Sequence, residues 1–209
     1  MIKNLFIKSA ASDGRMTSVR SLSATKDGIV GSLRMQEFRQ ILILPKSTTD
    51  EFGIEPGALK ENVIVDTPFD IHSLESGTVM ILGSVKVRLT FQCEPCAQIK
   101  NIVNVRKIMF KRGYLGQILN SGSMSVGDDV AILKEKYEPI PYKHADRIKW
   151  YLEKCEEPVT ASDLVLNIGL SKSYCRAVPN IIRNRHDIDK SKIIYRNSDK
   201  NRTQLELMV

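Results

Sequence analysis

The sequence predicts a mainly β protein, in which a β-barrel domain over residues 1–138 precedes a small α/β winged helix-turn-helix domain over residues 139–209. The first two-thirds of the chain consist of short apolar runs separated by Gly, Pro, Asp and Ser, a pattern typical of many short strands. After Tyr137, Pro139 and Pro141 end this rhythm, and the apolar residues that follow have helical spacing. The 209 residues are enough for two small domains with separate cores.

Short apolar runs mark the candidate strands of the barrel. They are residues 40–44, 62–65, 85–91, 115–119 and 130–133. In 85–91, apolar and polar residues alternate, so we expect a strand with one apolar and one polar face. Strands at this spacing, with few helical periods between them, indicate a barrel or a sandwich.

The second domain begins with a helix that starts near Lys143. A second helix is expected to start at Thr160, which is placed as an N-cap with Asp163 in the first turn, and to stop at Gly169. Ser171 then caps a third helix after only a short turn, which is the spacing of a helix-turn-helix.

The chain after these helices is expected to form a β-hairpin, with strands at 193–195 and 203–207 around a polar turn at 196–201. Three helices and a hairpin make a winged helix. Pro179 lies inside the third helix, where a missing N–H and a steric clash cost about 3 kcal/mol. We therefore expect a kink or a break there.

Composition narrows the functional classes. The net charge is +7, which gives a weak attraction for polyanions. Residues 139–209 carry +4 of this charge, although this segment is only about half as long as the first domain. The chain has neither the pattern of a secretory leader nor an apolar run of ~18 residues, so we expect a cytoplasmic protein with no membrane partner. Four cysteines are too few for a disulfide framework.

Several segments of the barrel, in this order, resemble the MOSC family, named after the C-terminal part of molybdenum cofactor sulfurase. The segments are residues 53–57, 61–65, 77–83, 93–96, 113–116, 120–122 and 126–128. The resemblance covers about residues 15–133, and it implies a β-barrel. Some members bind the molybdenum cofactor and reduce N-hydroxylated bases, and others are thought to carry sulfur. The functional cysteine of the family maps onto Cys96, and the resemblance makes Cys96, Arg39 and Asn62 the candidate cofactor-binding residues.

The sequence departs from the family between Gly28 and Arg39. Where many members have Gly-x-x-Gly-Asp-Arg-His, this chain reads Gly-Ile-Val-Gly-Ser-Leu-Arg, so the Asp and the His are missing. It also has no room for the extra N-terminal subdomain of cofactor-binding members. These differences favour, as an alternative, a barrel kept as a ligand sensor or a scaffold.

Cys96 follows a strand and Pro95, a position expected at the barrel rim. A thiolate there would be a nucleophile, a sulfur carrier or a soft-metal ligand, and cations such as Arg39 or Lys100 would favour it. The alternative is a buried, inert thiol. Cys93 and Cys96 form a Cys-x-x-Cys pair, but a zinc site needs two more ligands and a redox pair needs a βαβ setting, so we predict no metal site.

Basic residues are concentrated in the winged helix, where 171–202 contain nine basic and three acidic residues. Four residues at the start of the third helix are expected to reach bases: Lys172, Ser173, Tyr174 and Arg176. Seven more are expected to contact phosphates: Arg183, Arg185, Lys190, Lys192, Arg196, Lys200 and Arg202. The alternative role of this module is contact with a protein partner.

The resulting hypothesis is a MOSC protein, associated with DNA or RNA, that acts through Cys96 on a sulfur-containing or N-hydroxylated base-like substrate. The alternatives are a non-enzymatic DNA-binding regulator whose barrel senses a ligand, and an adaptor in a nucleic-acid modification or defence complex. The cofactor suggested by the resemblance is the molybdenum cofactor.

Overall fold

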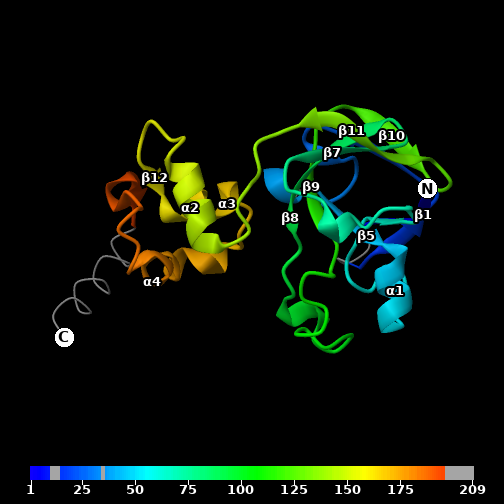
Figure 1. Cartoon of the computed structure of the whole chain (residues 1–209), viewed down its shortest axis with the longest axis horizontal. Helices are drawn as coiled ribbons and strands as arrows, with labels where there is room; N and C mark the ends of the chain where they lie inside the picture. Colours follow the sequence, from blue (N-terminus) through cyan, green and yellow to red (C-terminus); the bar gives the residue numbers. More distant parts are fainter. Residues whose placement is uncertain (10–14, 34–35, 196–209) are drawn as a thin grey trace. The chain divides into compact units, whose positions relative to one another are not determined.

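A computed structural model describes residues 1–9, 15–33 and 36–195 of the chain (Figure 1). The contacts divide the chain into two compact units, Met1–Pro139 and Ile140–Val209. The division lies one residue beyond the junction expected from the two proline residues. Each unit is described by itself below.

Unit 1 consists mainly of short strands. Its strands are β1 (Ile2–Ile7), β2 (Thr17–Val19), β3 (Ser21–Thr25), β4 (Gly28–Ile29), β5 (Ile41–Pro45), β6 (Val63–Val65), β7 (Thr78–Leu82), β8 (Val85–Gln92), β9 (Tyr114–Ile118), β10 (Gly122–Ser125) and β11 (Val130–Lys136). The α-helix α1 (Lys46–Phe52) follows β5, and the 3-10 turns are η2 (Glu37–Arg39), η3 (Ile71–Ser73) and η4 (Ala97–Ile99). All five expected apolar runs lie in strands.

Among the described residues, eight strands form one curled sheet in the order β11-β7-β8-β9-β5-β6-β1-β2, and β10-β3-β4 form a second sheet. The pairings of the large sheet are antiparallel except for β5 with β6, which is parallel. The crossover that parallel pairing requires contains α1. The mainly β half-barrel agrees with the barrel that the sequence predicts for the first domain.

The core of unit 1 is formed by the apolar faces of these strands, with residues such as Ile41, Val87 and Leu89 fully buried. Arg88 and Thr90, on the expected polar face of β8, are also buried, whereas Lys86 on the same face remains partly exposed. Arg88 lies 5.8 Å from the Phe38 ring centre, and the Thr90 hydroxyl donates to the carbonyl of Phe38 at 2.7 Å. This part of the polar side is therefore packed inside the molecule because the 3-10 turn η2 lies over it.

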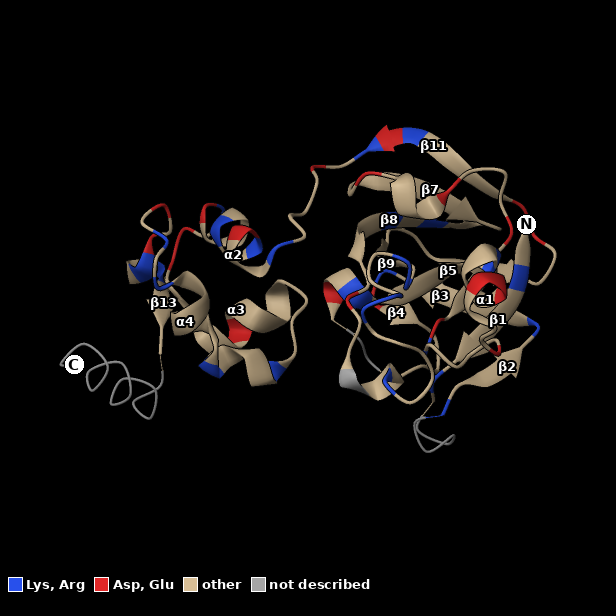
Figure 2. Cartoon of the chain, turned by 60° about the horizontal axis from the view of Figure 1, so that its bottom comes forward, with Lys and Arg blue, Asp and Glu red and all other residues tan. Residues whose placement is uncertain are grey.

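Unit 2 is helical. Its elements are α2 (His144–Leu152), β12 (Val159–Thr160), α3 (Ala161–Asn167), η5 (Lys172–Arg176), α4 (Val178–Ile182), η6 (Lys190–Lys192) and β13 (Ile193–Ile194). The strands β12 and β13 pair in parallel, and apolar residues from all three helices form a separate core. In the charge-coloured view, Lys and Arg are dispersed over several elements of this unit (Figure 2).

The expected caps of the second helix are present. The Thr160 hydroxyl accepts the Asp163 N–H at 3.1 Å, and Gly169, with φ 76, ends the helix while Leu170 N–H donates to the Val165 carbonyl at 2.6 Å. Both features stabilise the ends of α3 by satisfying main-chain groups that have no partner within the helix.

The expected third helix is broken, as Pro179 suggested. Residues Lys172–Arg176 form the 3-10 turn η5, and α4 begins only at Val178 with Pro179 in its first turn, where a missing N–H is harmless. The expected break thus divides the predicted third helix into η5 and α4. Of the expected hairpin, the strand beginning at Ile193 is present, whereas the turn and second strand, 196–207, lie outside the described residues.

The described helices are short, between five and nine residues for the four α-helices. In the part of the chain that the structure describes, no helix has the length and apolar character needed to cross a bilayer.

Candidate functional site

Cys96 lies in the loop that follows β8, directly before the 3-10 turn η4. Its thiol is exposed, and its carbonyl accepts the N–H of Ile99 at 3.2 Å, which begins the turn. Cys93, three residues earlier and directly after β8, donates its N–H to the carbonyl of Gly113 at 2.9 Å. Cys96 therefore lies in a loop whose first residue, Cys93, is hydrogen-bonded to the residue before β9.

The guanidinium of Arg112 contacts the Cys96 thiol. Its Nη1 lies 3.3 Å from Cys96 Sγ and 2.6 Å from the carbonyl of Glu94, and its Nη2 lies 3.3 Å from the carbonyl of Leu59. Arg112 is only 5% exposed. A buried cation held by two segments of the chain, 94–96 and Leu59, is a fixed hydrogen-bond donor at the sulfur, the environment in which a cysteine becomes reactive.

The cations expected beside Cys96 have other positions. Arg39 lies on η2, where its Nη1 pairs with Glu94 Oε2 at 3.6 Å, so its charge is shared with a carboxylate next to the site. Lys100 is exposed and no hydrogen bond joins it to Cys96. Sequence reasoning missed Arg112, because it lies 16 residues from Cys96 and only the fold brings the two together.

Asn62 does not join Cys96. Its Oδ1 accepts the N–H of Leu42 at 2.9 Å, and its Nδ2 donates to the carbonyl of Phe6 at 3.3 Å. Both ends of the amide thus bridge the main chains of β5 and β1. These bonds stabilise the sheet, and the cofactor-binding role of Asn62 stays a prediction.

His72 holds the backbone next to Arg112. Its Nε2 accepts the N–H of Gly113 at 3.1 Å, and its Nδ1 lies 3.5 Å from Asp70 Oδ1. Burial lowers the pKa of His72, opposed by the nearby Asp70 charge. Gly113 has φ 84, and a Cβ there would lie 2.3 Å from the carbonyl oxygen of Ile43, so only glycine fits this position.

Glu61 is completely buried, and the charge of Arg112 acts on its carboxyl group. Its Oε1 accepts the N–H of Gly57 at 2.5 Å, whereas its Oε2 has no partner among the described residues. Burial raises the pKa of Glu61, and the charge of Arg112 acts in the opposite direction. Sequence reasoning did not single out this carboxyl group, because nothing in the pattern around it predicts complete burial.

The two cysteines of the Cys-x-x-Cys pair differ. Cys93 is buried, and burial raises the pKa of its thiol, which favours the unreactive neutral form. Cys96 is exposed next to Arg112. Within the described ranges, no group of three or more His, Cys, Asp or Glu side chains is placed to hold a metal ion.

Comparison with known proteins gives a family for this arrangement. The profile of the MOSC domain matches residues 32–131, which include the strands β5 to β10 and the Cys96 loop. The chain carries a MOSC domain. None of the curated proteins compared with the chain matches it.

Two solved structures have the same fold. The YuaD protein from Bacillus subtilis is 20% identical, covers 66% of this chain and 96% of its own, and has a TM-score of 0.56. YiiM from Escherichia coli is 18% identical, covers 94% of this chain and 100% of its own, and has a TM-score of 0.52. At this identity the likeness shows the fold alone. The alignment with YiiM extends beyond the MOSC domain into unit 2.

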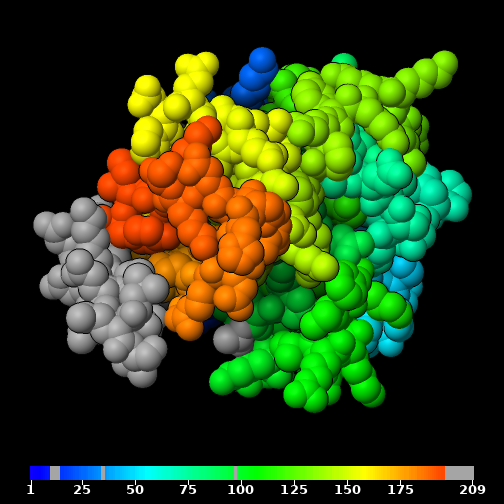
Figure 3. Space-filling model, turned by 60° about the vertical axis from the view of Figure 1, so that its left-hand side comes forward, coloured from blue at the N-terminus to red at the C-terminus, as the bar shows by residue number. Residues whose placement is uncertain are grey.

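In the MOSC domain, the loop 97–111 leaves from Cys96 and returns at Arg112, so the contact between these two residues closes its base. Two side chains, Ile99 and Ile108, are completely buried and anchor the loop in a second apolar cluster of unit 1. Three others point outwards, with exposed fractions of 42% for Ile102, 46% for Met109 and 48% for Phe110. Figure 3 shows the green segment around residue 110 standing out at the surface of unit 1.

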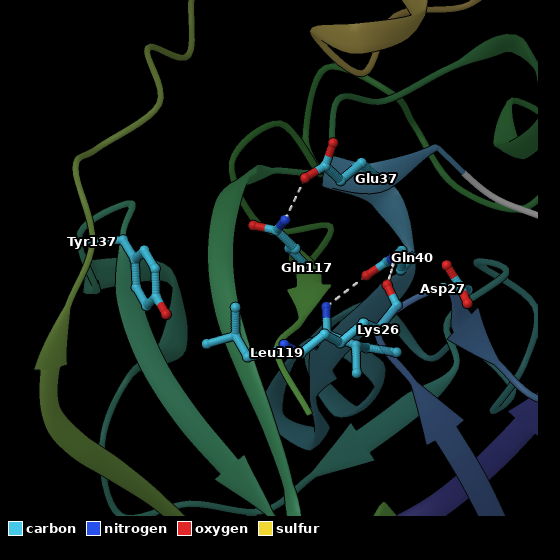
Figure 4. Close-up of a pocket in the computed structure, with 8 residues that line it drawn as sticks. Lys26, Asp27, Glu37, Gln40, Gln117, Leu119 and Tyr137 are labelled. Carbon is cyan, nitrogen blue, oxygen red and sulfur yellow. Dashed lines mark hydrogen bonds between the residues drawn. The ribbon is translucent and has the colours of Figure 1, made fainter. Parts of the chain in front are cut away.

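A cavity of about 490 Å³ lies at the opposite end of β9 from Gly113 (Figure 4). Gln40 builds its wall: its Nε2 donates to the Lys26 carbonyl at 2.6 Å, and its Oε1 accepts the Ile118 N–H at 2.6 Å. Gln117 Nε2 donates to Glu37 Oε1 at 2.6 Å. The residues that line the cavity are Lys26, Asp27, Glu37, Gln40, Gln117, Ile118, Leu119 and Tyr137.

The residues of unit 2 expected at bases all lie on η5 and are exposed. The Tyr174 ring packs edge-on against His144, with 5.1 Å between the ring centres. Ser173 Oγ donates to Ser171 Oγ at 3.1 Å. The side chains of Lys172 and Arg176 make no hydrogen bond or ion pair within the described residues. All four side chains are presented by a 3-10 turn instead of an α-helix.

Several residues expected at phosphates are engaged inside unit 2. Arg185 bonds Asp146 Oδ1 and Asp187 Oδ1, each at 2.7 Å, and Lys192 Nζ donates to the carbonyl of Cys155 at 2.7 Å. The ammonium of Lys190 donates to a main-chain carbonyl at 3.0 Å, and Arg183 bonds a neighbouring Asn side chain at 2.8 Å. Arg196, Lys200 and Arg202 lie outside the described residues.

Proposed function

We propose that this protein is a nucleic-acid-associated MOSC protein that acts through Cys96 on a sulfur-containing or N-hydroxylated base-like substrate. The observation that carries the proposal is the exposed Cys96 thiol with the buried Arg112 guanidinium 3.3 Å away. Such a sulfur can attack an electrophile, accept a sulfur atom or bind a soft metal. Arg112 holds the sulfur in place. Arg39, on η2, pairs with Glu94 in the same loop as Cys96.

The residues at the site fit the molybdenum cofactor in part. Cys96 supplies the soft thiolate ligand that such a metal prefers, and the cations Arg112 and Arg39 suit an anionic cofactor. When bound, the group would supply redox chemistry at its metal. Asn62 is engaged in the sheet, so the cofactor would be held by Cys96, Arg112 and Arg39 only.

Relative alkylation rates test the role of Cys96. We expect iodoacetamide to modify Cys96 faster than the buried Cys93 and faster than Cys155 and Cys175, which are both half-buried. Mass spectrometry of partially labelled full-length protein gives all four rates in one experiment. Labelling of Cys96 at or below the rate of Cys155 would contradict the proposal. Metal and pterin analysis of wild-type protein and of Cys96→Ser, purified from the native host, then tests the cofactor.

Association with nucleic acid is proposed for the exposed cations of η5. Lys172 and Arg176 have no carboxylate partner in the described part of the chain, whereas Arg185 and Lys192 are engaged within unit 2. On B-form DNA, each lost phosphate contact lowers the slope of log affinity against log salt by about 0.9. We therefore expect Lys172→Gln with Arg176→Gln to lower the slope for a generic duplex by about two, and Arg185→Gln to affect the stability of unit 2 instead.

A second candidate function is a regulator or adaptor without catalysis, in which the barrel binds a ligand. The cavity of about 490 Å³ favours it, because its size is that of a small-molecule site and it lies away from Cys96. For a non-catalytic regulator or adaptor, we expect Cys96→Ser to leave the biological activity intact and Gln117→Leu, within the cavity, to remove it. Loss of activity in Cys96→Ser with activity retained in Gln117→Leu would support the reactive cysteine instead.

A further inference from the structure

The loop 97–111 carries cations that the fold does not use. Between Pro95 and Gly127 the sequence has five basic residues and no acidic one. Lys111 pairs with Glu51 at 2.6 Å, whereas the exposed Lys100, Arg106 and Lys107 make no side-chain hydrogen bond or ion pair with any described residue. Three uncompensated charges on one loop attract anions more than charges dispersed among carboxylates do.

The same loop also exposes three large apolar side chains. Ile99 and Ile108 anchor the loop, while Ile102, Met109 and Phe110 are each more than 40% exposed. Phe110 has φ 64, a backbone conformation that a bulky residue adopts rarely and at a cost. Backbone strain of this kind is found mostly at binding sites.

We propose that the loop 97–111 binds single-stranded nucleic acid, with phosphates at Lys100, Arg106 and Lys107 and a base stacked on Phe110. This inference rests on the proposed function, because it places the strand next to Cys96 and so makes the substrate a base within a polynucleotide. Proteins that bind single strands combine cations along the backbone with aromatic rings under the bases. Phe110 immediately precedes Lys111 and Arg112, and Arg112 contacts the Cys96 sulfur at 3.3 Å. A strand held on the loop would thus lie beside the thiol.

An anionic membrane would also suit cations next to apolar side chains. The loop offers three exposed apolar residues on a rigid, anchored base, which is a small contact for a bilayer but sufficient for one or two bases. Binding to vesicles is therefore an outcome that the experiment must separate.

The test measures binding of a labelled 12-nucleotide dT strand and its rU equivalent to the full-length protein by fluorescence anisotropy at several salt concentrations. In Arg106→Gln/Lys107→Gln, the slope of log affinity against log salt should fall by about 1.4, because each contact to a single strand contributes about 0.7. The matched control, Arg20→Gln/Lys46→Gln, removes the same charge from exposed positions elsewhere in unit 1 and should leave the slope unchanged.

Phe110→Ala should weaken single-strand binding by about fivefold or more, since stacking of one base is lost. The control Ile132→Ala removes a similarly exposed apolar side chain from β11 and should have no effect. Bound dT strand should also slow the alkylation of Cys96 but not that of Cys155.

The inference is overturned if the loop variant and its control bind the strands equally, or if the loop variants lose binding only to vesicles of anionic phospholipid. These outcomes are distinct from failure of the proposed function. If Cys96 is alkylated slowly and strand binding depends on the loop residues, the reactive thiol is contradicted and the loop proposal stands. If Cys96 is alkylated fast and strand binding does not depend on the loop residues, the loop proposal is contradicted and the reactive thiol stands.

Discussion

At the scale of single residues, Arg112 decides how the candidate site works. It joins the loop that carries Glu94 and Cys96 to the carbonyl of Leu59, which is far from that loop in the sequence. The same side chain thus supplies a positive charge at the thiol and holds the loop that carries it. A substitution should therefore affect both the chemistry and the local structure, and the two effects need separate measurements.

Replacing Arg112 with Gln should slow alkylation of Cys96 by about threefold or more, because the cation beside the sulfur is lost. Cys155 lies in unit 2 and serves as the internal reference in the same digest. Arg112→Lys keeps the charge and should retain part of the rate. An unchanged ratio of Cys96 to Cys155 labelling in Arg112→Gln, with an unchanged melting curve, would show that the contact has no chemical role.

His72 makes the same region sensitive to pH. Because burial lowers the pKa of His72, the folded protein takes up the proton at lower pH than the unfolded chain, whose His groups titrate near 6.5. Its contribution to stability is fully present above that value and is lost as the pH falls below it, towards the lower folded pKa. A protonated Nε2 also cannot accept the Gly113 N–H.

We therefore expect the melting temperature of unit 1, followed by far-UV circular dichroism, to fall as the pH is lowered from 7 to 5. His72→Gln removes the titrating group and should reduce this fall, at some cost in stability at pH 7. His186, exposed in unit 2, provides the control substitution His186→Gln, for which the pH dependence of unit 1 should not change.

At the scale of elements, a buried arginine holds unit 2 together. Arg147 on α2 is completely buried, and it donates to the carbonyls of Pro141 at 2.8 Å, Tyr142 at 2.7 Å and Ile168 at 3.3 Å. It thereby ties the segment before α2 and the end of α3 to one helix. Lost hydrogen bonds from a charged donor cost about 1.5–3 kcal/mol each, partly offset here by the relief of a buried charge.

Arg147→Met should lower the free energy of unfolding of unit 2 by about 3 kcal/mol, because three carbonyls lose their donor. The chain has one tryptophan, Trp150 on α2, so urea unfolding followed by tryptophan fluorescence reports this unit. Arg183→Met replaces an exposed arginine and should change the stability by less than about 0.5 kcal/mol. Equal effects would mean that Arg147 does not anchor the helices.

The elements also show what sequence alone can and cannot predict. Apolar runs predicted the strands β5, β6, β8, β9 and β11, and the caps at Thr160 and Gly169 predicted the ends of α3, because these signals are local. The break near Pro179 followed from the geometry of one residue. The sequence did not predict that Arg88 packs against η2 or that Arg147 is buried and donates to three carbonyls. Both contacts depend on segments that are distant in the sequence.

The candidate site was predictable to the same degree. The family resemblance predicted Cys96 from a short local segment, residues 93–96. It did not show that Arg112 is the cation at the sulfur or that Asn62 is engaged by main-chain groups, since both depend on tertiary contacts.

At the scale of the whole molecule, the two units have separate cores with different chemistry, a β core in one and a helical core in the other. We expect fragments 1–139 and 140–209 to fold alone, each with a cooperative melt. In the full chain, Arg147→Met should shift only the fluorescence transition, and His72→Gln should shift only the transition seen by circular dichroism. A single transition, moved by both substitutions alike, would contradict independent units.

The outer strand β11 has a consequence for how this protein behaves at high concentration. An unpaired sheet edge is a template for a strand of another molecule, and charges on that edge oppose such pairing. Here Lys134, Glu135 and Lys136 occupy the end of β11, and two of them pair with side chains of the same unit at 3.3 and 2.7 Å, which keeps them in place. Figure 2 shows these charges at the end of the strand. Resistance to aggregation in unit 1 would then depend on three adjacent side chains, and a preparation in which they are neutralised would be the one to form fibrils.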